Sequence, residues 1–230
     1  MRYFMEGRES DSPYVEMVWQ GESGPNYTPT CPADANWNLL ILKHGRRIQV
    51  LVEGPLTKAK YKEQPEGAQF LVVKFKLGAY LSYLPVTNLL DDAATLPEGA
   101  GKSFYLNGSL WQLPSFDNVE TFVARMVREE LLVSEPVVKG VLQNEPQAFS
   151  ARTVRRRFLH ATGLTPTVIH QIERAKQAMM MLQDGMSILD TVFAAGYADQ
   201  PHLTRSLKRF VGATPAELAW ERKPEVEGVG

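Results

Sequence analysis

The sequence predicts an α+β protein, with a β-rich N-terminal domain followed by an all-α domain. Two observations lead to this prediction. Short runs of β-branched, aromatic and leucine residues, bounded by glycine or proline, fill roughly the first hundred positions. From Asp117 onward, apolar residues instead recur at helical spacing. We expect residues 1–114 to form the first domain, residues 115–221 the second, and residues 222–230 a disordered tail.

Four strands are predicted in the N-terminal domain. They cover Tyr14–Gly21, Trp37–Gly45, Arg46–Gly54 and Ala68–Gly78. The segment KHGRR joins the second and third strands as a hairpin turn. Residues 79–116 mix short apolar clusters with turn residues, so we assign no element there and place the domain boundary within this segment or just after it.

A helix is predicted over residues 117–133, where it serves as a connector or as a dimer surface. Asp117 and Glu120 have the spacing of a capping box at its start. Ser134 and Glu135 end this helix, and Pro136 begins another, because proline is favoured at the first position of a helix.

Four more helices are predicted after residue 150, each with a start signal. Ser150, Ser187 and Asp199 are N-cap residues, and Thr165 with Pro166 opens the longest helix. The four helices cover residues 151–163, 167–185, 188–196 and 200–212. The third and fourth are joined by a four-residue turn around Gly196, which is the pattern of a helix-turn-helix unit.

Two of these helices carry an apolar face and an opposite face of polar and basic residues. The inward residues are Ala151, Val154 and Phe158 on the first helix and Leu203, Leu207 and Phe210 on the last. The outward residues are Arg152, Arg155 and Arg156 on the first and Gln200, Pro201, Thr204, Arg205 and Lys208 on the last. Arginine and glutamine pair with base edges in the major groove, whereas threonine and lysine suit phosphates. Arg157 flanks the apolar face, and we expect it to meet a phosphate or an acid.

The charge distribution agrees with a polyanion-binding second domain. The net charge of the chain is −1, but residues 1–149 carry 14 Lys or Arg against 18 Asp or Glu, while residues 150–223 carry 11 against 6. An excess of this size is also ordinary for a solvated surface, so it supports the helix pattern without standing alone.

The segment from about Glu135 to Leu218 resembles the AraC/XylS-type transcription regulators. The motifs are SARTVRRRF, RAKQAMMML and GYADQPHLTRSLKRFVGATP. The resemblance implies two helix-turn-helix units joined by a linking helix, and double-stranded DNA bound through adjacent major-groove segments. The candidate DNA-binding residues are Arg152, Thr153, Arg155, Arg156, Gln200, Pro201, Thr204, Arg205 and Lys208.

The chain departs from the family pattern at three places. Leu207 stands where the family usually has an aromatic residue, and Pro201 stands where a polar side chain often contacts a base. The connection that leads to Ser150 is longer than a standard turn and contains Pro146. The docking angle of the first unit, and whether it contacts bases, therefore stay open.

The N-terminal segments PADANWNLLILKHG and VVKFKLGAYLSYLPVTNLLDD resemble the sensor-like β domain of some of these regulators. The resemblance implies a small-molecule effector, self-association into a homodimer, or both, but no ligand-binding residue is carried over. Trp37, Tyr80, Tyr83 and Trp111 line a ligand cavity or serve as core residues, and the second is the commoner role. RNA polymerase is a further candidate partner implied by the family.

Other chemistries find no support in the sequence. His44, His160, His170 and His202 lack metal-ligand spacing, so we expect no metal, and Cys31 has no resolving cysteine nearby. Met179–Leu182 is expected to fill core space. No phosphate loop, nucleophile motif or cofactor motif is present, so we expect neither an enzyme nor a cofactor.

We also expect no membrane partner and no secretory signal. No apolar run reaches membrane-spanning length, and Met1–Asp11 has no apolar h-region. The family implies a cytoplasmic, nucleoid-associated protein. Two functions remain in view: a sequence-specific DNA-binding regulator, or a ligand-binding or protein-interaction module whose helix-turn-helix units do not read sequence.

Overall fold

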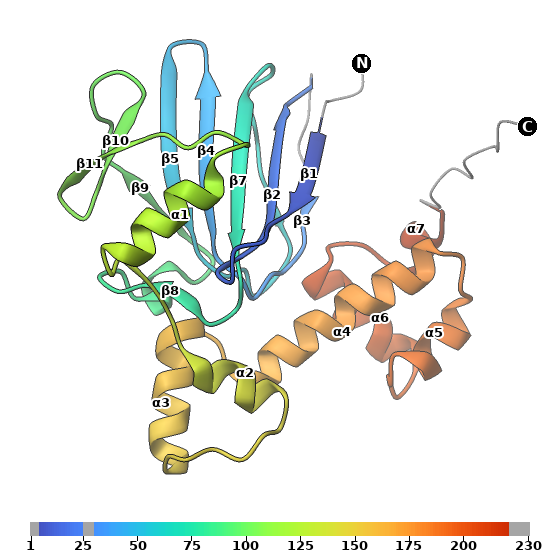
Figure 1. The fold of residues 1–230 in the computed structure, drawn as a ribbon. Helices are drawn as coiled ribbons and strands as arrows, with labels where there is room; N and C mark the ends of the chain where they lie inside the picture. The colour runs from blue at the N-terminus through green and yellow to red at the C-terminus, as the bar shows by residue number, and fades with distance from the viewer. Residues whose placement is uncertain (1–4, 25–29, 221–230) are drawn as a thin grey trace, which may run out of the picture.

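A computed structural model describes residues 5–24 and 30–220. Its N-terminal part is built on a six-stranded antiparallel sheet with the order β1-β2-β7-β4-β5-β9 (Figure 1). The strands are β1 (Met5–Glu9), β2 (Val15–Glu22), β4 (Asn38–His44), β5 (Arg47–Glu53), β7 (Gln69–Phe75) and β9 (Ala93–Leu96). Four of them confirm the predicted strands to within a few residues. The predicted hairpin joins β4 to β5, and its turn places Gly45 at a φ of 59°.

Small elements fill the segment in which no element is predicted. Residues 79–116 contain β8 (Ala79–Leu81), the 3-10 helix η1 (Val86–Leu89), β9, and the hairpin of β10 (Ser103–Leu106) with β11 (Ser109–Gln112). Two further strand pairs lie beside the main sheet. One joins β3 (Thr30–Cys31) to β6 (Lys60–Tyr61), and the other joins β8 to β12 (Leu132–Ser134).

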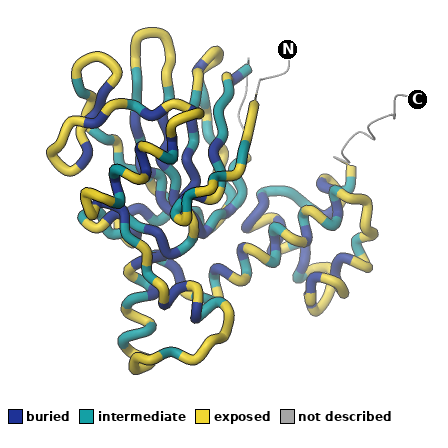
Figure 2. The backbone as a smooth tube through the Cα atoms, viewed as in Figure 1, coloured by how far each residue is buried: buried dark blue, intermediate teal, exposed yellow. Residues whose placement is uncertain are grey.

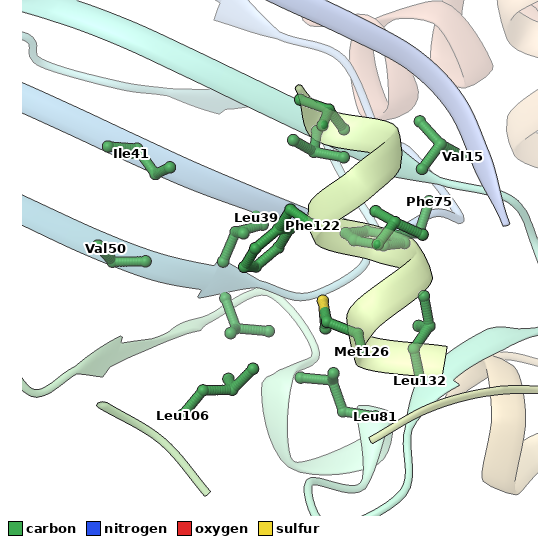
Figure 3. Packing of buried hydrophobic residues seen from close by; sticks show 14 of the residues in the cluster. Val15, Leu39, Ile41, Val50, Phe75, Leu81, Leu106, Phe122, Met126 and Leu132 are labelled. Atoms are coloured by element: carbon green, nitrogen blue, oxygen red, sulfur yellow. The ribbon is translucent and has the colours of Figure 1, made fainter. Parts of the chain in front are cut away.

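Helix α1 (Val119–Arg128) packs across the sheet and closes the first core. Figure 3 shows Phe122 and Met126 of α1 among Leu39, Ile41 and Val50 of the strands. The packing follows from the helical spacing of the apolar residues in the sequence, which puts them on one face of α1.

Two details of the predicted helix over residues 117–133 are wrong. The helix ends at Arg128, because Glu130 takes a φ of 56° and the chain then enters β12, which pairs with β8. The expected capping box is also absent. Asn118 is the N-cap, and the Glu120 carboxylate binds Arg8 of β1 at 2.7 Å instead.

The C-terminal part is helical, as predicted. It comprises α2 (Pro136–Leu142), α3 (Ala151–Thr162), α4 (Pro166–Gln183), α5 (Ile188–Ala194), α6 (Gln200–Phe210) and α7 (Pro215–Trp220). The expected N-caps are confirmed, since Ser150, Thr165, Ser187 and Asp199 each accept a backbone N–H of the following helix. Pro136 begins α2 behind the N-cap Glu135. Among the helices of residues 5–24 and 30–220, none combines the length and the apolar composition of a membrane span.

Buried apolar residues form two clusters. The first contains residues of the sheet, β8, η1, the β10–β11 hairpin, α1 and Leu132. The second contains residues of α3–α7 with Val138 of α2, and also Ala33 and Ala35 of the N-terminal part. Because α1 belongs to the first cluster, we now propose a domain boundary between β12 and α2 in place of one near residue 115. The boundary stays a proposal. The tail predicted for residues 222–230 lies outside the described residues.

Candidate nucleic-acid interface

The second helix-turn-helix unit is formed by α5 and α6. Residues 195–199 connect the two helices, one residue more than expected, and Gly196 takes a φ of 66° that suits glycine. Asp199 Oδ1 then accepts the His202 N–H at 2.7 Å and starts α6. The buried Tyr197 hydroxyl lies 2.9 Å from Ser206 Oγ, which ties the connection to the inner face of α6.

Helix α6 is fixed by its apolar face and leaves the opposite face free. Leu203 and Leu207 are 0% exposed and Phe210 is 5% exposed. On the other face Gln200, Pro201, Arg205 and Lys208 are exposed, and Thr204 is half-buried with its hydroxyl bonded to the Gln200 carbonyl at 2.9 Å. The predicted outward face is thus exposed to solvent, and Thr204 is less available for a ligand than expected.

The first unit is formed by α2 and α3, and its connection is long. Residues 143–150 join the two helices, as the sequence indicated, and Ser150 Oγ accepts the Thr153 N–H at 3.3 Å to begin α3. Arg157 meets an acid, one of its two expected partners, because its Nε lies 2.8 Å from Glu135 Oε2. That pair joins α3 to the start of α2.

The outer face of α3 carries three exposed arginines, Arg152, Arg155 and Arg156, with Thr153 half-buried between them. They border a hollow on the surface together with Ala151 and Leu159. Figure 2 shows that α3 is a mixture of exposed, half-buried and buried residues. Ala151 was expected to face inward but is exposed, because it stands at the first turn beyond the edge of the core. Phe158 is buried as expected, and Val154 is half-buried.

The arginines of the two outer faces have no hydrogen-bond or ion-pair partner among the described residues. Within the described part of the chain, no hydrogen bond or ion pair involves Arg152, Arg155, Arg156 or Arg205. Other arginines of the same domain are engaged: besides Arg157, Arg174 of α4 stacks over the Tyr197 ring at 4.4 Å and donates to the Gly196 carbonyl at 3.4 Å. Sequence reasoning missed Arg174, because only the folded chain brings it to the turn of the second unit.

Several of the other residues singled out in the sequence lie away from the outer faces of α3 and α6. Trp37 stacks on Phe75 at 3.9 Å, and His160 meets the edge of Tyr80. Burial raises the pKa of Tyr83 to about 12, and burial also raises the pKa of the Cys31 thiol. In the expected core segment of α4, Leu182 is buried but Met180 is exposed. Among the described residues, no cluster of three His, Cys, Asp or Glu is placed to hold a metal ion.

The segment that contains α3–α7 is similar to a known protein family. Residues 147–219 match the model of a family described as a helix-turn-helix domain. The chain carries an AraC-type helix-turn-helix domain. A curated relative, the HTH-type transcriptional regulator RipA of Corynebacterium glutamicum, is 35% identical to this chain over 89 residues. That stretch is 38% of this chain and 27% of RipA, so the match spans about a quarter of the relative's length.

Two solved structures match nearly the whole chain at lower sequence identity than RipA. Apo ToxT from Vibrio cholerae has a TM-score of 0.44 at 10% identity, over 94% of this chain and 100% of that chain. ToxT with a bound unsaturated fatty acid has a TM-score of 0.40 at 11% identity, over 98% of each chain.

Proposed function

We propose that the protein is a sequence-specific DNA-binding regulator of transcription. In this proposal α3 and α6 are the two recognition helices, and each enters one of two adjacent major-groove segments about one helical turn, roughly 34 Å, apart. The N-terminal domain modulates binding through an effector or through self-association, and RNA polymerase is the partner through which transcription responds.

One observation carries the proposal. Helix α3 precedes α4 in the chain, and helix α6 packs against α4 (Figure 1). Both helices have capped N-termini and buried apolar residues. Helix α3 presents Arg152, Arg155 and Arg156 and α6 presents Arg205, all four exposed and without a partner among the described residues. Leaving several arginines unpaired on a face of a helix is favourable only in water or against an anion. Two such faces, placed on helix-turn-helix units, suit the phosphates and base edges of duplex DNA.

The side chains suggest different roles within each face. Gln200 and Arg205 have the donors and acceptors that pair in bidentate fashion with adenine and guanine, so we assign them to bases. Lys208 stands one turn further along α6 and is assigned to a phosphate. Pro201 has no backbone N–H and contributes only van der Waals contact. On α3 we assign Arg152 and Arg156 to bases, with Arg155 and Thr153 beside them.

Selection of bound duplexes from a random pool tests this proposal. It is carried out at physiological salt with the wild type, with an Arg152→Ala/Arg156→Ala double variant, and with Arg205→Ala. We expect two enriched sequence blocks about one helical turn, roughly 10 base pairs, apart. Each block is lost with the variant of its own helix.

Other outcomes are equally informative. A single block that disappears only with Arg205→Ala means that the first unit holds the backbone without reading bases. If the wild type enriches no sequence at all, the proposal is wrong, and the chain is a ligand-binding or protein-interaction module instead.

A further inference from the structure

The C-terminal end of α6 is held by the N-terminal domain. The Ala33 amide donates to the Phe210 carbonyl at 2.6 Å, and the Ala59 amide donates to the Arg209 carbonyl at 2.8 Å. Carbonyls in the last turn of a helix have no partner within the helix. Here two of them are satisfied by backbone donors that come from a different domain, more than a hundred positions earlier in the sequence.

Close packing accompanies these hydrogen bonds. A Cβ atom placed on Gly212, just after α6, would lie 2.8 Å from Thr30 Cγ2 and 3.0 Å from Ala59 Cβ. Ala33 is 0% exposed and belongs to the same apolar cluster as Leu203 and Leu207. The β3–β6 pair and the residues beside it therefore form part of the surface against which the C-terminal end of α6 packs.

A charged contact ties α4 to the same place. Lys176 Nζ lies 3.1 Å from Asp34 Oδ1, and Lys74 Nζ of β7 lies 2.9 Å from Asp34 Oδ2. Burial alone would raise the pKa of Asp34, but Lys176 and Lys74 outweigh it and hold this pKa below its usual value. The carboxylate is charged and half-buried, and it bridges the sheet to the middle of the linking helix.

The first unit rests on the N-terminal domain as well. Helix α3 packs against η1 and β8, and Gly163 at its end lies against the side chains of Val86 and Leu90. Tyr80 of β8 meets His160 of α3 edge to face at 5.1 Å. One body thus contacts both helix-turn-helix units and the helix between them, while the outer faces of α3 and α6 stay exposed.

We propose that the N-terminal domain is a brace that sets the spacing and rotational phase of the two recognition helices, with Asp34 and Lys176 as its positioning residues. The inference rests on the proposed function. Without the brace, α4 is the covalent link between the units, and bending or twisting of this one helix changes where α3 and α6 meet DNA. With the brace, both units are held against the same rigid domain, so their relative position is fixed. The protein then discriminates between sites by the separation of their two blocks as well as by their sequence.

The matched variants are Lys176→Gln and Gln177→Glu. Both lower the net charge by one on the same helix, but only the first removes the contact to Asp34, since Gln177 is exposed. Lys176→Arg keeps a cation at the contact. The first measurement is hydrogen exchange of the Ala33 and Ala59 amides, compared with amides in the central strand β7. We expect Lys176→Gln to speed exchange of the two amides about ten-fold or more, with β7 unchanged. Gln177→Glu and Lys176→Arg should match the wild type.

The second measurement uses the site selected by the wild type, with one or two base pairs inserted or removed between its blocks. We expect the wild type to lose affinity about ten-fold or more on these altered sites, and Lys176→Gln to lose several-fold less. Equal spacing preference in Lys176→Gln and Gln177→Glu would overturn the brace. If no site is selected, the proposed function fails, while the exchange measurement still tests the contact. Unchanged amide exchange in Lys176→Gln would show that the ion pair does not hold the domains together.

Discussion

Arg205 and Lys208 lie one turn apart on the exposed face of α6, yet the two side chains should behave differently. Arg205→Ala should cost about 1–3 kcal/mol on the selected site and relax specificity at one base position, because a guanidinium that pairs with a base edge carries sequence information. Lys208→Ala should weaken binding by a similar factor on every sequence, because a phosphate contact carries none. Titrations on matched and scrambled duplexes measure both effects.

Neither substitution should alter folding, since both side chains are exposed and the apolar face of α6 is untouched. Thermal unfolding of the variants is the control. If both variants lose the same affinity on matched and scrambled duplexes, the assignment of Arg205 to a base is wrong.

At the scale of elements, the ion pair between Arg8 and Glu120 joins strand β1 to helix α1. The Arg8 guanidinium donates to both carboxylate oxygens, at 2.7 and 2.9 Å, and this lowers the pKa of Glu120 to about 2. A carboxyl whose pKa is lower in the folded state stabilises the fold fully above its unfolded pKa of roughly 4. That stabilisation is lost as the pH falls toward 2.

We therefore expect Glu120→Gln to lower the free energy of unfolding at pH 7 by about 1 kcal/mol, a modest value because the pair is partly exposed to water. The difference from the wild type should shrink steadily between pH 4 and about 2. Urea unfolding at several pH values measures it, with Glu129→Gln as the control for an exposed pair at the C-terminal end of α1. A difference that is constant across this pH range would show that the Glu120 charge does not stabilise the docking of α1.

The sequence predicted those elements whose signals are local. Ser150, Thr165, Ser187 and Asp199 start helices where expected, because a cap acts on the next turn of the chain. The sequence did not predict contacts and elements that depend on residues distant in the chain. Glu120 had the spacing of a capping box but is taken by Arg8, and the residues after Arg128 leave the helical pattern to pair with β8.

One helix with a local start signal is absent from the sequence prediction. Helix α7 begins at Pro215, and Thr214 and Glu217 exchange hydrogen bonds across its first turn in the manner of a capping box. On the candidate site, the outward residues of α6 followed from helical periodicity alone. Arg174 and Lys176 did not, because their roles depend on how α4 packs against the turn of the second unit and against Asp34.

At the scale of the whole molecule, the net charge of the chain differs from the local charge of the surface that we propose to bind DNA. The net charge is −1, but the exposed faces of α3 and α6 carry unpaired arginines, and many acids lie in the N-terminal domain. Counterion release depends on the number of phosphates that the protein contacts. At moderate salt, screening limits the range of an exposed charge to about 10 Å, so acids far from the DNA have little effect on binding. DNA affinity should therefore follow the local charge of the two faces and not the net charge.

Two variants with opposite effects on net charge test this expectation. Glu63→Gln/Glu66→Gln removes two exposed negative charges from the N-terminal domain, whereas Lys208→Ala removes one positive charge from α6. We expect the slope of log affinity against log salt concentration to stay at the wild-type value in the first variant and to become shallower by about one in the second. Fluorescence anisotropy on the selected duplex at several salt concentrations measures the slopes. If the glutamate variant steepens the slope as much as Lys208→Ala flattens it, binding responds to net charge, and the two helix faces are not the surface that contacts phosphate.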